Sequence, residues 1–368
     1  MKTSSLKKTF ATGVALAALA LVPALHAQVT VNIEGGSASS SVIYDRATNL
    51  YAGGSFTVSG STSANVATFV GSSLNPNLSG YGTITLNINL NNGAINGLNA
   101  LVNHAPGTGD TNYLGVGIVP TFVDSATSPE AVGIDSVANN FVDAPTYVVP
   151  LVYVRNTNYA DVAAITNLTQ RQAVELETTT NKAGFYGSTG TNAVYFVGRN
   201  KSSAVRTEID QNIYFTGNIK TFTNNASGLP VLDGRADPGQ SSASTEVTIV
   251  TALTNSIGTL AVQNIKSPLG AIAFEGVAYS VTNVINGSYP LWGTEHYYYI
   301  QQGFTGAPSS VNGQLAIVNA FYNSVTNATF QTNSNPVFGN NFITISSLRV
   351  ATRAAGADGG TIVPLPNY

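Results

Sequence analysis

Alternating hydrophobic and polar residues first occur at Val29-Thr30-Val31-Asn32-Ile33, and this pattern predicts a β-strand with one buried face. Gly35-Gly36 ends the strand, and a serine-rich turn, Ser37 to Ser41, follows it. The next hydrophobic residues recur at the spacing of one helical face: Ile43, Ala47, Leu50 and Tyr51. The sequence therefore opens as strand, turn and helix.

Further strands and helices are predicted along the chain. Thr83 to Leu90 alternates as a half-buried strand does, and a short helix is expected at Gly97 to Val102. Tyr147 to Val154 is almost entirely hydrophobic, which is typical of a strand buried on both faces of a parallel sheet. Thr169 and Gln172 have the spacing of a capping box, which predicts a helix that runs through Glu177.

The alternation of strands and helices continues. Ala193 to Val197 predicts a strand, and the helix after it has hydrophobic residues spaced by four: Val205, Ile209 and Ile213. A helix around Val247 to Leu253 precedes a strand at Thr259 to Val262. This order indicates an α/β protein with largely parallel sheets. The sequence shows no internal repeat, coiled-coil pattern or long linker.

The first 27 residues have the pattern of a secretory signal peptide. Three lysines (Lys2, Lys7 and Lys8) precede a hydrophobic run from Phe10 to Leu25, and Leu25-His26-Ala27 offers a small residue at the cut. We expect cleavage after Ala27 and a periplasmic or secreted product. No later run reaches the roughly 18 hydrophobic residues of a membrane span, so the product is not expected to be embedded in a membrane.

Charged residues make up only 9 % of the 368 residues, against about 25 % in an average soluble protein. Three of the 15 Lys and Arg lie in the signal peptide, so the remaining chain has a net charge of −6 with its 18 acidic residues. This balance argues against nucleic-acid binding, which needs a basic excess. The hydrophobic content of 43 % is enough to build a core in each of two domains.

The absence of cysteine excludes thiol catalysis, zinc–thiolate sites, iron–sulfur clusters and a lipid-modified N-terminal cysteine. After the signal peptide only His104 and His296 remain, and no G-x-S-x-G motif stands near either. No residues show the spacing of metal ligands. We therefore expect a protein that is not an enzyme and has no cofactor or metal; an exported hydrolase would lack an evident nucleophile–base pair.

Two strand-to-helix turns contain groups that suit an anion. In the first, Ser37 to Ser41 offers hydroxyls and backbone N–H groups at a helix start. A serine that merely caps the helix is the simpler explanation of this turn.

The second turn is basic. Arg199, Lys201 and Arg206 lie within eight positions at a helix start, where the helix dipole disfavours a cation unless an anion is present. Arg199 could hold two oxygens of an oxyanion, with Ser202 or Ser203 and backbone N–H groups beside it. A solvated basic helix face explains the same pattern equally well.

Several short segments occur in an order that one known family shares. They are Ile33 to Ala38, Asn92 to Gly97, Gly133-Ile134-Asp135-Ser136, Val197 to Arg206, Phe274-Glu275-Gly276-Val277 and Asn286 to Trp292. In order and spacing they resemble the phosphate-binding, PstS-like periplasmic substrate-binding proteins, over nearly all of the chain after residue 27. The segment around Arg199 is similar to that family's anion loop, and the segment around Asp135 is similar to its acidic loop.

The resemblance implies an α/β, two-domain type II periplasmic-binding-protein-like fold with a ligand cleft between the domains. Domain I would be discontinuous, at residues 28–150 plus 258–368, and domain II would span residues 151–257. The hinge strands would be Val148–Val154 and Thr259–Val262.

The resemblance also implies a function, the reversible capture of a small oxyanion by closure of the domains, with phosphate as the first candidate. The membrane component of an ABC transporter would be the partner. The ligand-binding residues would be Ser39, Ser40, Asp135, Arg199, Ser203 and Arg206, of which Arg206 is the weakest candidate. Arg199 would supply charge, the serines would donate hydrogen bonds, and Asp135 would accept the proton of a monoprotonated anion.

The sequence departs from the family's pattern at the anion loop. Ser203-Ala204-Val205 replaces Ser-Gly-Thr, so one hydroxyl donor is lost and Ala204 has a Cβ where glycine allows close approach. Ala94 stands where the family has a serine. These losses favour a second hypothesis, a ligand-free extracellular structural or adhesive protein, which the low charge and the 17 tyrosines also fit.

Two features have simpler explanations outside the resemblance. Asp135, before Ser136, is explained by a turn or helix cap. The single tryptophan, Trp292, lies beside Tyr289, Glu295, His296 and Tyr297-Tyr298-Tyr299, and this cluster could stack a sugar or aromatic ligand. We expect it to be packed in the core instead.

Overall fold

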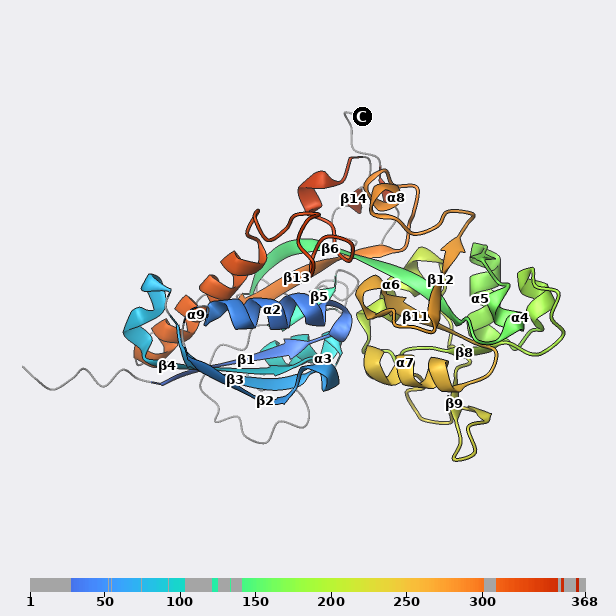
Figure 1. Cartoon of the computed structure of the whole chain (residues 1–368), viewed down its shortest axis with the longest axis horizontal. Coiled ribbons are helices and arrows are strands. Elements are labelled where there is room, and N and C mark those ends of the chain that lie inside the picture. The colour runs from blue at the N-terminus through green and yellow to red at the C-terminus, as the bar shows by residue number, and fades with distance from the viewer. Residues whose placement is uncertain are drawn as a thin grey trace, which may run out of the picture.

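The computed structural model describes residues 28–51, 53, 55–73, 75–91, 93–102, 121–124, 133, 141–300, 309–349, 352–353 and 362–363. Two lobes lie side by side and the long strand β6 (Phe141–Asn156) runs from one into the other (Figure 1). The His104 and Asp135 positions and the signal peptide lie outside the described residues.

The first lobe comprises β1 (Val29–Gly35), α2 (Ser40–Leu50), β2 (Phe56–Ser61), β3 (Val66–Ser72), β4 (Thr83–Asn89), α3 (Ala94–Val102), β5 (Thr121–Asp124), β13 (Trp292–Ile300) and α9 (Ser309–Val325). The second comprises α4 (Ala160–Ala163), β7 (Asn167–Leu168), α5 (Gln170–Thr178), β8 (Tyr195–Val197), α6 (Ala204–Asn212), β9 (Phe222–Asn224), β10 (Pro230–Leu232), α7 (Ala243–Ala252), β11 (Ser256–Ala261) and β12 (Leu269–Phe274). Helix α8 (Val281–Ile285) and the short pair β14 (Thr352–Arg353) and β15 (Ile362–Val363) complete the described elements.

Most of the strands form one mixed sheet with the order β2-β3-β4-β1-β5-β13-β6-β11-β8, and β12 pairs with both β6 and β7. Strand β1 is parallel to β4 and β5, and β11 is parallel to β8. The other long pairings, including β3 with β4 and β13 with β6, are antiparallel. The expectation of largely parallel sheets is therefore wrong, although the α/β class is confirmed.

Strand β6 shows why the direction of pairing was misjudged. Its hydrophobic run from Tyr147 to Val154 is buried, as the sequence predicted. However, β6 pairs antiparallel with β13 at residues 141–150 and with β11 and β12 at residues 151–156. A continuous hydrophobic run indicates that both faces of a strand are buried, but it does not indicate whether the neighbouring strands are parallel or antiparallel.

Several local predictions are confirmed by the structure. The capping box of α5 is formed: the Thr169 hydroxyl accepts the backbone N–H of Gln172 at 3.2 Å, and the Gln172 side chain accepts that of Thr169 at 3.0 Å. Helices α2, α3, α6 and α7 and strands β1, β4, β8 and β11 occur where alternation or helical spacing predicted them, with shifts of a few residues at their ends. The β2–β3 hairpin, β12, β13 and α9 were missed.

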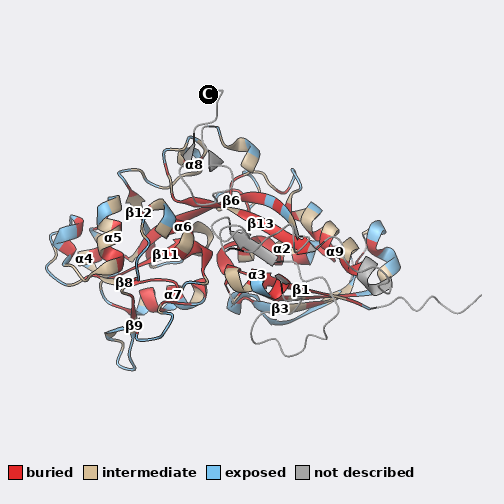
Figure 2. Cartoon of the chain, turned by 180° about the vertical axis from the view of Figure 1, so that it is seen from behind, coloured by how far each residue is buried: buried red, intermediate tan, exposed pale blue. Residues whose placement is uncertain are grey.

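The core lies along β1, β4 and β13 in the first lobe, along β8, β11 and β12 in the second, and along β6, which runs through both (Figure 2). Trp292, Tyr289, Tyr297 and Tyr298 are all at most 1 % exposed, which confirms that the aromatic cluster packs in the core. The imidazole of His296 contacts the Asp143 carboxylate at 2.5 Å. These aromatic rings are therefore not available to stack on a ligand.

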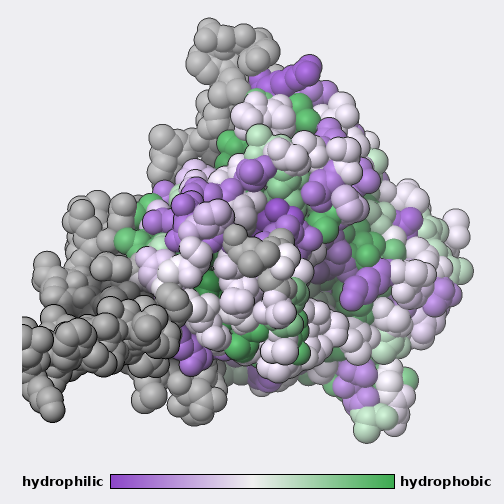
Figure 3. Space-filling model, turned by 60° about the vertical axis from the view of Figure 1, so that its left-hand side comes forward, coloured by the Kyte–Doolittle hydropathy of each residue, from purple (hydrophilic) through white to green (hydrophobic). Residues whose placement is uncertain are grey.

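The face of the molecule in Figure 3 is a mosaic of polar and weakly hydrophobic residues, and no broad hydrophobic patch covers its described part. Among the described helices, none combines the length and hydrophobicity that crossing a membrane requires.

Candidate functional site: the cleft between the lobes

The turn after β1 lies against the second lobe. Gly36 is followed by a single 3-10 turn, Ser37–Ser39, from which α2 begins. The Ser37 hydroxyl accepts the backbone N–H of Ala243, the first residue of α7, at 3.2 Å. The serine-rich turn of the first lobe therefore contacts a helix start of the second lobe directly.

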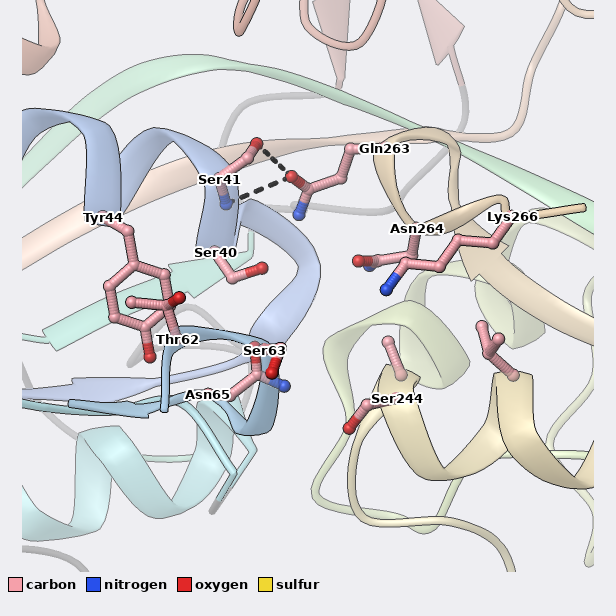
Figure 4. Close-up of a pocket in the computed structure, with 12 residues that line it drawn as sticks. Ser40, Ser41, Tyr44, Thr62, Ser63, Asn65, Ser244, Gln263, Asn264 and Lys266 are labelled. Atoms are coloured by element: carbon pink, nitrogen blue, oxygen red, sulfur yellow. Dashed lines mark hydrogen bonds between the residues drawn. The ribbon is translucent and has the colours of Figure 1, made fainter. Parts of the chain in front are cut away.

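Gln263, just after β11, strengthens this contact. Its Oε1 accepts the Ser41 backbone N–H at 3.2 Å and also the Ser41 hydroxyl (Figure 4). Its Nε2 donates to the backbone oxygens of Ser37, at 3.2 Å, and of Ala38. The amide of Gln263 thus binds two donors of Ser41 and the backbone oxygens of Ser37 and Ala38, all in the turn that begins α2.

A second contact between the lobes joins the start of α3 to the turn before α6. The backbone N–H of Ile95 donates to the Ser202 oxygen at 3.4 Å. Gly93 has a φ of +80°, and a Cβ at this position would stand 2.6 Å from the same oxygen. Only glycine fits this backbone conformation and this approach without strain.

Arg199 lies beneath these contacts and is 2 % exposed. Its Nε donates to the Gln240 oxygen at 2.9 Å, and its Nη2 donates to the Ser241 oxygen at 3.0 Å. The Glu246 carboxylate of α7 lies 3.8 Å from the Arg199 Nε, and both side chains are buried. Arg199 is therefore held by the protein itself rather than exposed as a mobile basic side chain.

Burial raises the pKa of Glu246 to about 8, although Arg199 and hydrogen bonds from Thr259 favour the ionised form. The Thr259 backbone N–H donates to Glu246 Oε1 at 2.6 Å. At pH 7 the carboxyl group therefore carries its proton most of the time.

A small cavity lies where the two turns meet. It is lined by Gly36, Ser37, Ala38 and Gly93 from the first lobe and by Arg199, Ser203, Ala204 and Val205 from the second. Its volume is about 10 Å³, which is room for about one water molecule. The structure thus brings together the two turns that the sequence singled out, in a closely packed arrangement.

The six predicted ligand-binding residues differ in where they lie. Arg199 and Ser203 line the small cavity, and the Ser203 hydroxyl makes no hydrogen bond within the described residues. Ser39 is fully buried beneath the turn, and its hydroxyl has no partner there either. Ser40 lines a second, larger cavity, described below. Asp135 lies outside the described residues, so its role stays a prediction.

Arg206 is part of a buried acidic cluster. Its Nε lies 3.3 Å from the Asp210 carboxylate, and its Nη1 donates to the Arg199 backbone oxygen at 3.4 Å. The Glu177 carboxylate, nearby, accepts the Tyr153 hydroxyl at 2.6 Å. Burial and then the Asp210 charge raise the pKa of Glu177 well above its usual range. These contacts hold Arg206 within the second lobe, and its part in ligand binding stays a prediction.

Comparisons with known proteins identify the architecture. No protein-family model matches the sequence, and no curated protein matches it. A solved structure described as a phosphate ABC transporter substrate-binding protein with bound phosphate, from Clostridium perfringens, matches 79 % of this chain and 92 % of its own, with a TM-score of 0.53 and 14 % identity. The chain has a type II periplasmic-binding-protein-like fold.

Two further structures are more distant. A phosphate transport receptor from Vibrio cholerae is 13 % identical, with a TM-score of 0.45 over 78 % of this chain and 93 % of its own. PstS from Borrelia burgdorferi is 13 % identical, with a TM-score of 0.41 over 86 % of this chain and 98 % of its own.

In this periplasmic-binding-protein-like fold, the larger cavity lies between the lobes, beside the small one. Its volume is about 330 Å³. Its walls are the starts of α2 and α7, the 62–65 segment and the segment after β11, and Figure 4 shows side chains from both lobes pointing across it. Its lining residues are Ser40, Ser41, Tyr44, Thr62, Ser63, Asn65, Ala243, Ser244, Val247, Gln263, Asn264 and Lys266.

Sequence reasoning missed several residues of this cleft. Glu246, Gln263 and Lys266 come from α7 and the segment after β11, which carry no motif. Gly93 was noted only as part of the segment Asn92 to Gly97 that resembles the known family, and its close approach to the second lobe was not predicted. Within the described residues, no three His, Asp or Glu side chains gather as a metal site would require.

Proposed function

We propose that this protein is an exported solute-binding protein that captures a small oxyanion group between its two lobes, with phosphate as the first candidate. The observation that carries the proposal is the small cavity, because each lobe supplies one of its two turns. A ligand that binds both turns stabilises the closed arrangement of the lobes.

The groups around the cavity suit an oxyanion. Arg199 supplies a positive charge beside Glu246, whose raised pKa favours the neutral carboxyl group, and Ser203 supplies a hydroxyl that has no partner within the described residues. The turn at Gly36 to Ala38 lies at the start of α2, where the helix dipole favours negative charge. We propose that Asp135 completes the site and selects a protonated anion.

The cavity is smaller than an oxyanion, so binding requires a local separation of the lobes followed by closure. The contacts that must yield are the hydrogen bonds of Ser37 with Ala243 and of Ile95 with Ser202, together with those of Gln263 to the turn that begins α2. Each of these bonds joins neutral groups and contributes only about 1 kcal/mol. The charge-assisted bonds of an anion with Arg199 are stronger, about 1.5–3 kcal/mol each, so they can replace the lost contacts.

The test is calorimetric titration of the protein without residues 1–27, after unfolding and refolding, with inorganic phosphate. We expect saturable 1:1 binding, its loss in Arg199→Ala and a weakening of about tenfold in Ser203→Ala. Ser227→Ala, on an exposed loop, is the matched control and leaves affinity unchanged. Absence of heat at millimolar phosphate would contradict phosphate as the ligand.

Export and a transporter partner belong to the same proposal. The signal-peptide pattern of residues 1–27 supports cleavage after Ala27 and a periplasmic or secreted location. The protein then delivers the captured solute to its partner, the membrane component of an ABC transporter. N-terminal sequencing of the exported protein should begin at Gln28. A product that retains residues 1–27 in the cytoplasm would contradict this part of the proposal.

A further inference from the structure

Five polar groups that line the larger cavity make no hydrogen bond or ion pair within the described residues. They are the hydroxyls of Ser40, Tyr44 and Thr62, the amide of Asn65 and the ammonium of Lys266. The other polar side chains of the cavity wall are engaged, as Gln263 is with the α2 turn. The three hydroxyls and the amide can each both donate and accept a hydrogen bond, whereas the ammonium can only donate.

Two of these groups are deeply buried. Tyr44 is 9 % exposed and Asn65 is 5 % exposed, and the Tyr44 hydroxyl oxygen has almost no contact with solvent. A buried polar group without a partner costs free energy, so proteins satisfy nearly all such groups. Asn65 points into the cavity from one wall while Lys266 reaches towards it from the other (Figure 4). This arrangement suits a ligand with several hydroxyl groups.

The charge of the cavity is also one-sided. Among the lining residues that the structure describes, Lys266 is the only charged one, and none of them is a carboxylate. The cavity also receives the starts of two helices, α2 with 11 residues and α7 with 10 residues, whose dipoles favour negative charge. A hydroxylated ligand that also carries a negative charge fits these groups better than a neutral sugar does.

The two cavities are neighbours. Ser37 lines the small cavity and Ala243 lines the larger one. The hydrogen bond between Ser37 and Ala243 therefore separates the two cavities. The small cavity has room for about one water molecule, whereas 330 Å³ is at the lower end of the range, about 300–1,000 Å³, that is common for sites of small organic ligands. Most of the space for a ligand therefore lies beside the Arg199 turn.

We propose that the larger cavity binds the hydroxylated part of a phosphate ester whose phosphoryl group lies at Arg199 and Ser203. The ligand is then a small sugar or polyol phosphate rather than inorganic phosphate. This inference rests on the proposed function, because it assigns the oxyanion group to the same turn. Separation of Ser37 from Ala243 during opening of the lobes joins the two cavities around the ligand.

The test compares glucose 6-phosphate, inorganic phosphate and glucose as ligands of the refolded protein without residues 1–27. We expect glucose 6-phosphate to bind at least ten times more tightly than phosphate. Tyr44→Phe and Thr62→Val each remove one hydroxyl with little change in shape, and Lys266→Gln removes the positive charge. Each should weaken the ester about three- to tenfold and leave phosphate affinity unchanged. Tyr195→Phe and Lys182→Gln, outside both cavities, should change neither affinity.

The outcomes separate the two proposals. Binding of phosphate and ester with equal affinity, unaffected by the three cavity variants, overturns the inference and leaves the proposed function standing. Ester binding that depends on Lys266 but survives Arg199→Ala overturns the placement of the phosphoryl group. Binding of glucose as tight as that of its phosphate overturns the ester class. If none of the three ligands binds, the inference and the proposed capture of phosphate fail together.

Discussion

The Arg199 Nε lies 3.8 Å from the Glu246 carboxylate, and neither side chain is more than 2 % exposed. This pair links the arginine turn before α6 to the first turns of α7. Because burial raises the pKa of Glu246 to about 8, the charge at the turn depends on pH. Below pH 8 the site carries the arginine charge, and above it a carboxylate competes with any bound anion.

The first prediction concerns this pair. Phosphate affinity should fall as the pH rises from 7 to 9, because ionised Glu246 then repels the anion. Glu246→Gln removes this charge and should bind phosphate several times more tightly than the unaltered protein at pH 9, with little difference at pH 6.5. Calorimetric titration at each pH gives the ratio of the phosphate affinity of the variant to that of the unaltered protein. The change in the protonation of phosphate with pH affects both affinities equally, so it cancels in this ratio. A constant ratio would contradict the prediction.

Glu177 should make the stability of the protein depend on pH. Its pKa is raised well above the ordinary value of 4.5 in the folded state, so the folded protein binds a proton that the unfolded chain has released. The free energy of unfolding should therefore decrease as the pH rises above about 4.5, by at most about 1.4 kcal/mol per pH unit. Glu177→Gln mimics the protonated group and should be more stable at pH 8, with a smaller change in melting temperature between pH 5 and pH 8. A steeper pH dependence in this variant would contradict the assignment.

Gly93→Ala should weaken closure of the lobes. Its Cβ would stand 2.6 Å from the Ser202 oxygen, so the lobes must shift apart to accommodate it. Gly228→Ala is a matched control, since Gly228 has a similar φ of +75° with no atom within 4 Å of the added Cβ. Both variants should lose about 1–2 kcal/mol of stability from backbone strain, and only Gly93→Ala should also lose ligand affinity. Thermal unfolding and titration with phosphate measure the two effects, and equal affinities would overturn this account.

Gln263→Leu should open the unliganded protein. The amide bridges Ser41 to the backbone oxygens of Ser37 and Ala38, and leucine of similar size makes none of these bonds. Small-angle X-ray scattering without ligand should show a larger radius of gyration than the unaltered protein has. The melting temperature separates opening from unfolding, because the variant should remain cooperatively folded. An unchanged radius would show that the other contacts hold the lobes closed by themselves.

The elements around the cleft show how far sequence reasoning reached. The serine turn before α2 and the arginine turn before α6 were found because each combines turn residues with the hydrophobic spacing of the following helix. The contact between them could not be derived, because it depends on how two lobes pack. Gln263 and Lys266 follow β11 by only a few residues, yet their sequence neighbourhood differs in no way from an ordinary loop.

The sequence by itself determined the elements that depend on neighbouring residues: the strand β1, the capping box of α5, the hydrophobic run of β6 and the two turns. Periodicity and capping act over a few residues, so they can be read from the chain directly. Only the tertiary structure decided the antiparallel neighbours of β6, the burial of Glu246 beside Arg199 and the cavity between α2 and α7. These features join residues tens to hundreds of positions apart, and the free energy that selects them comes from burial and pairing across the whole fold.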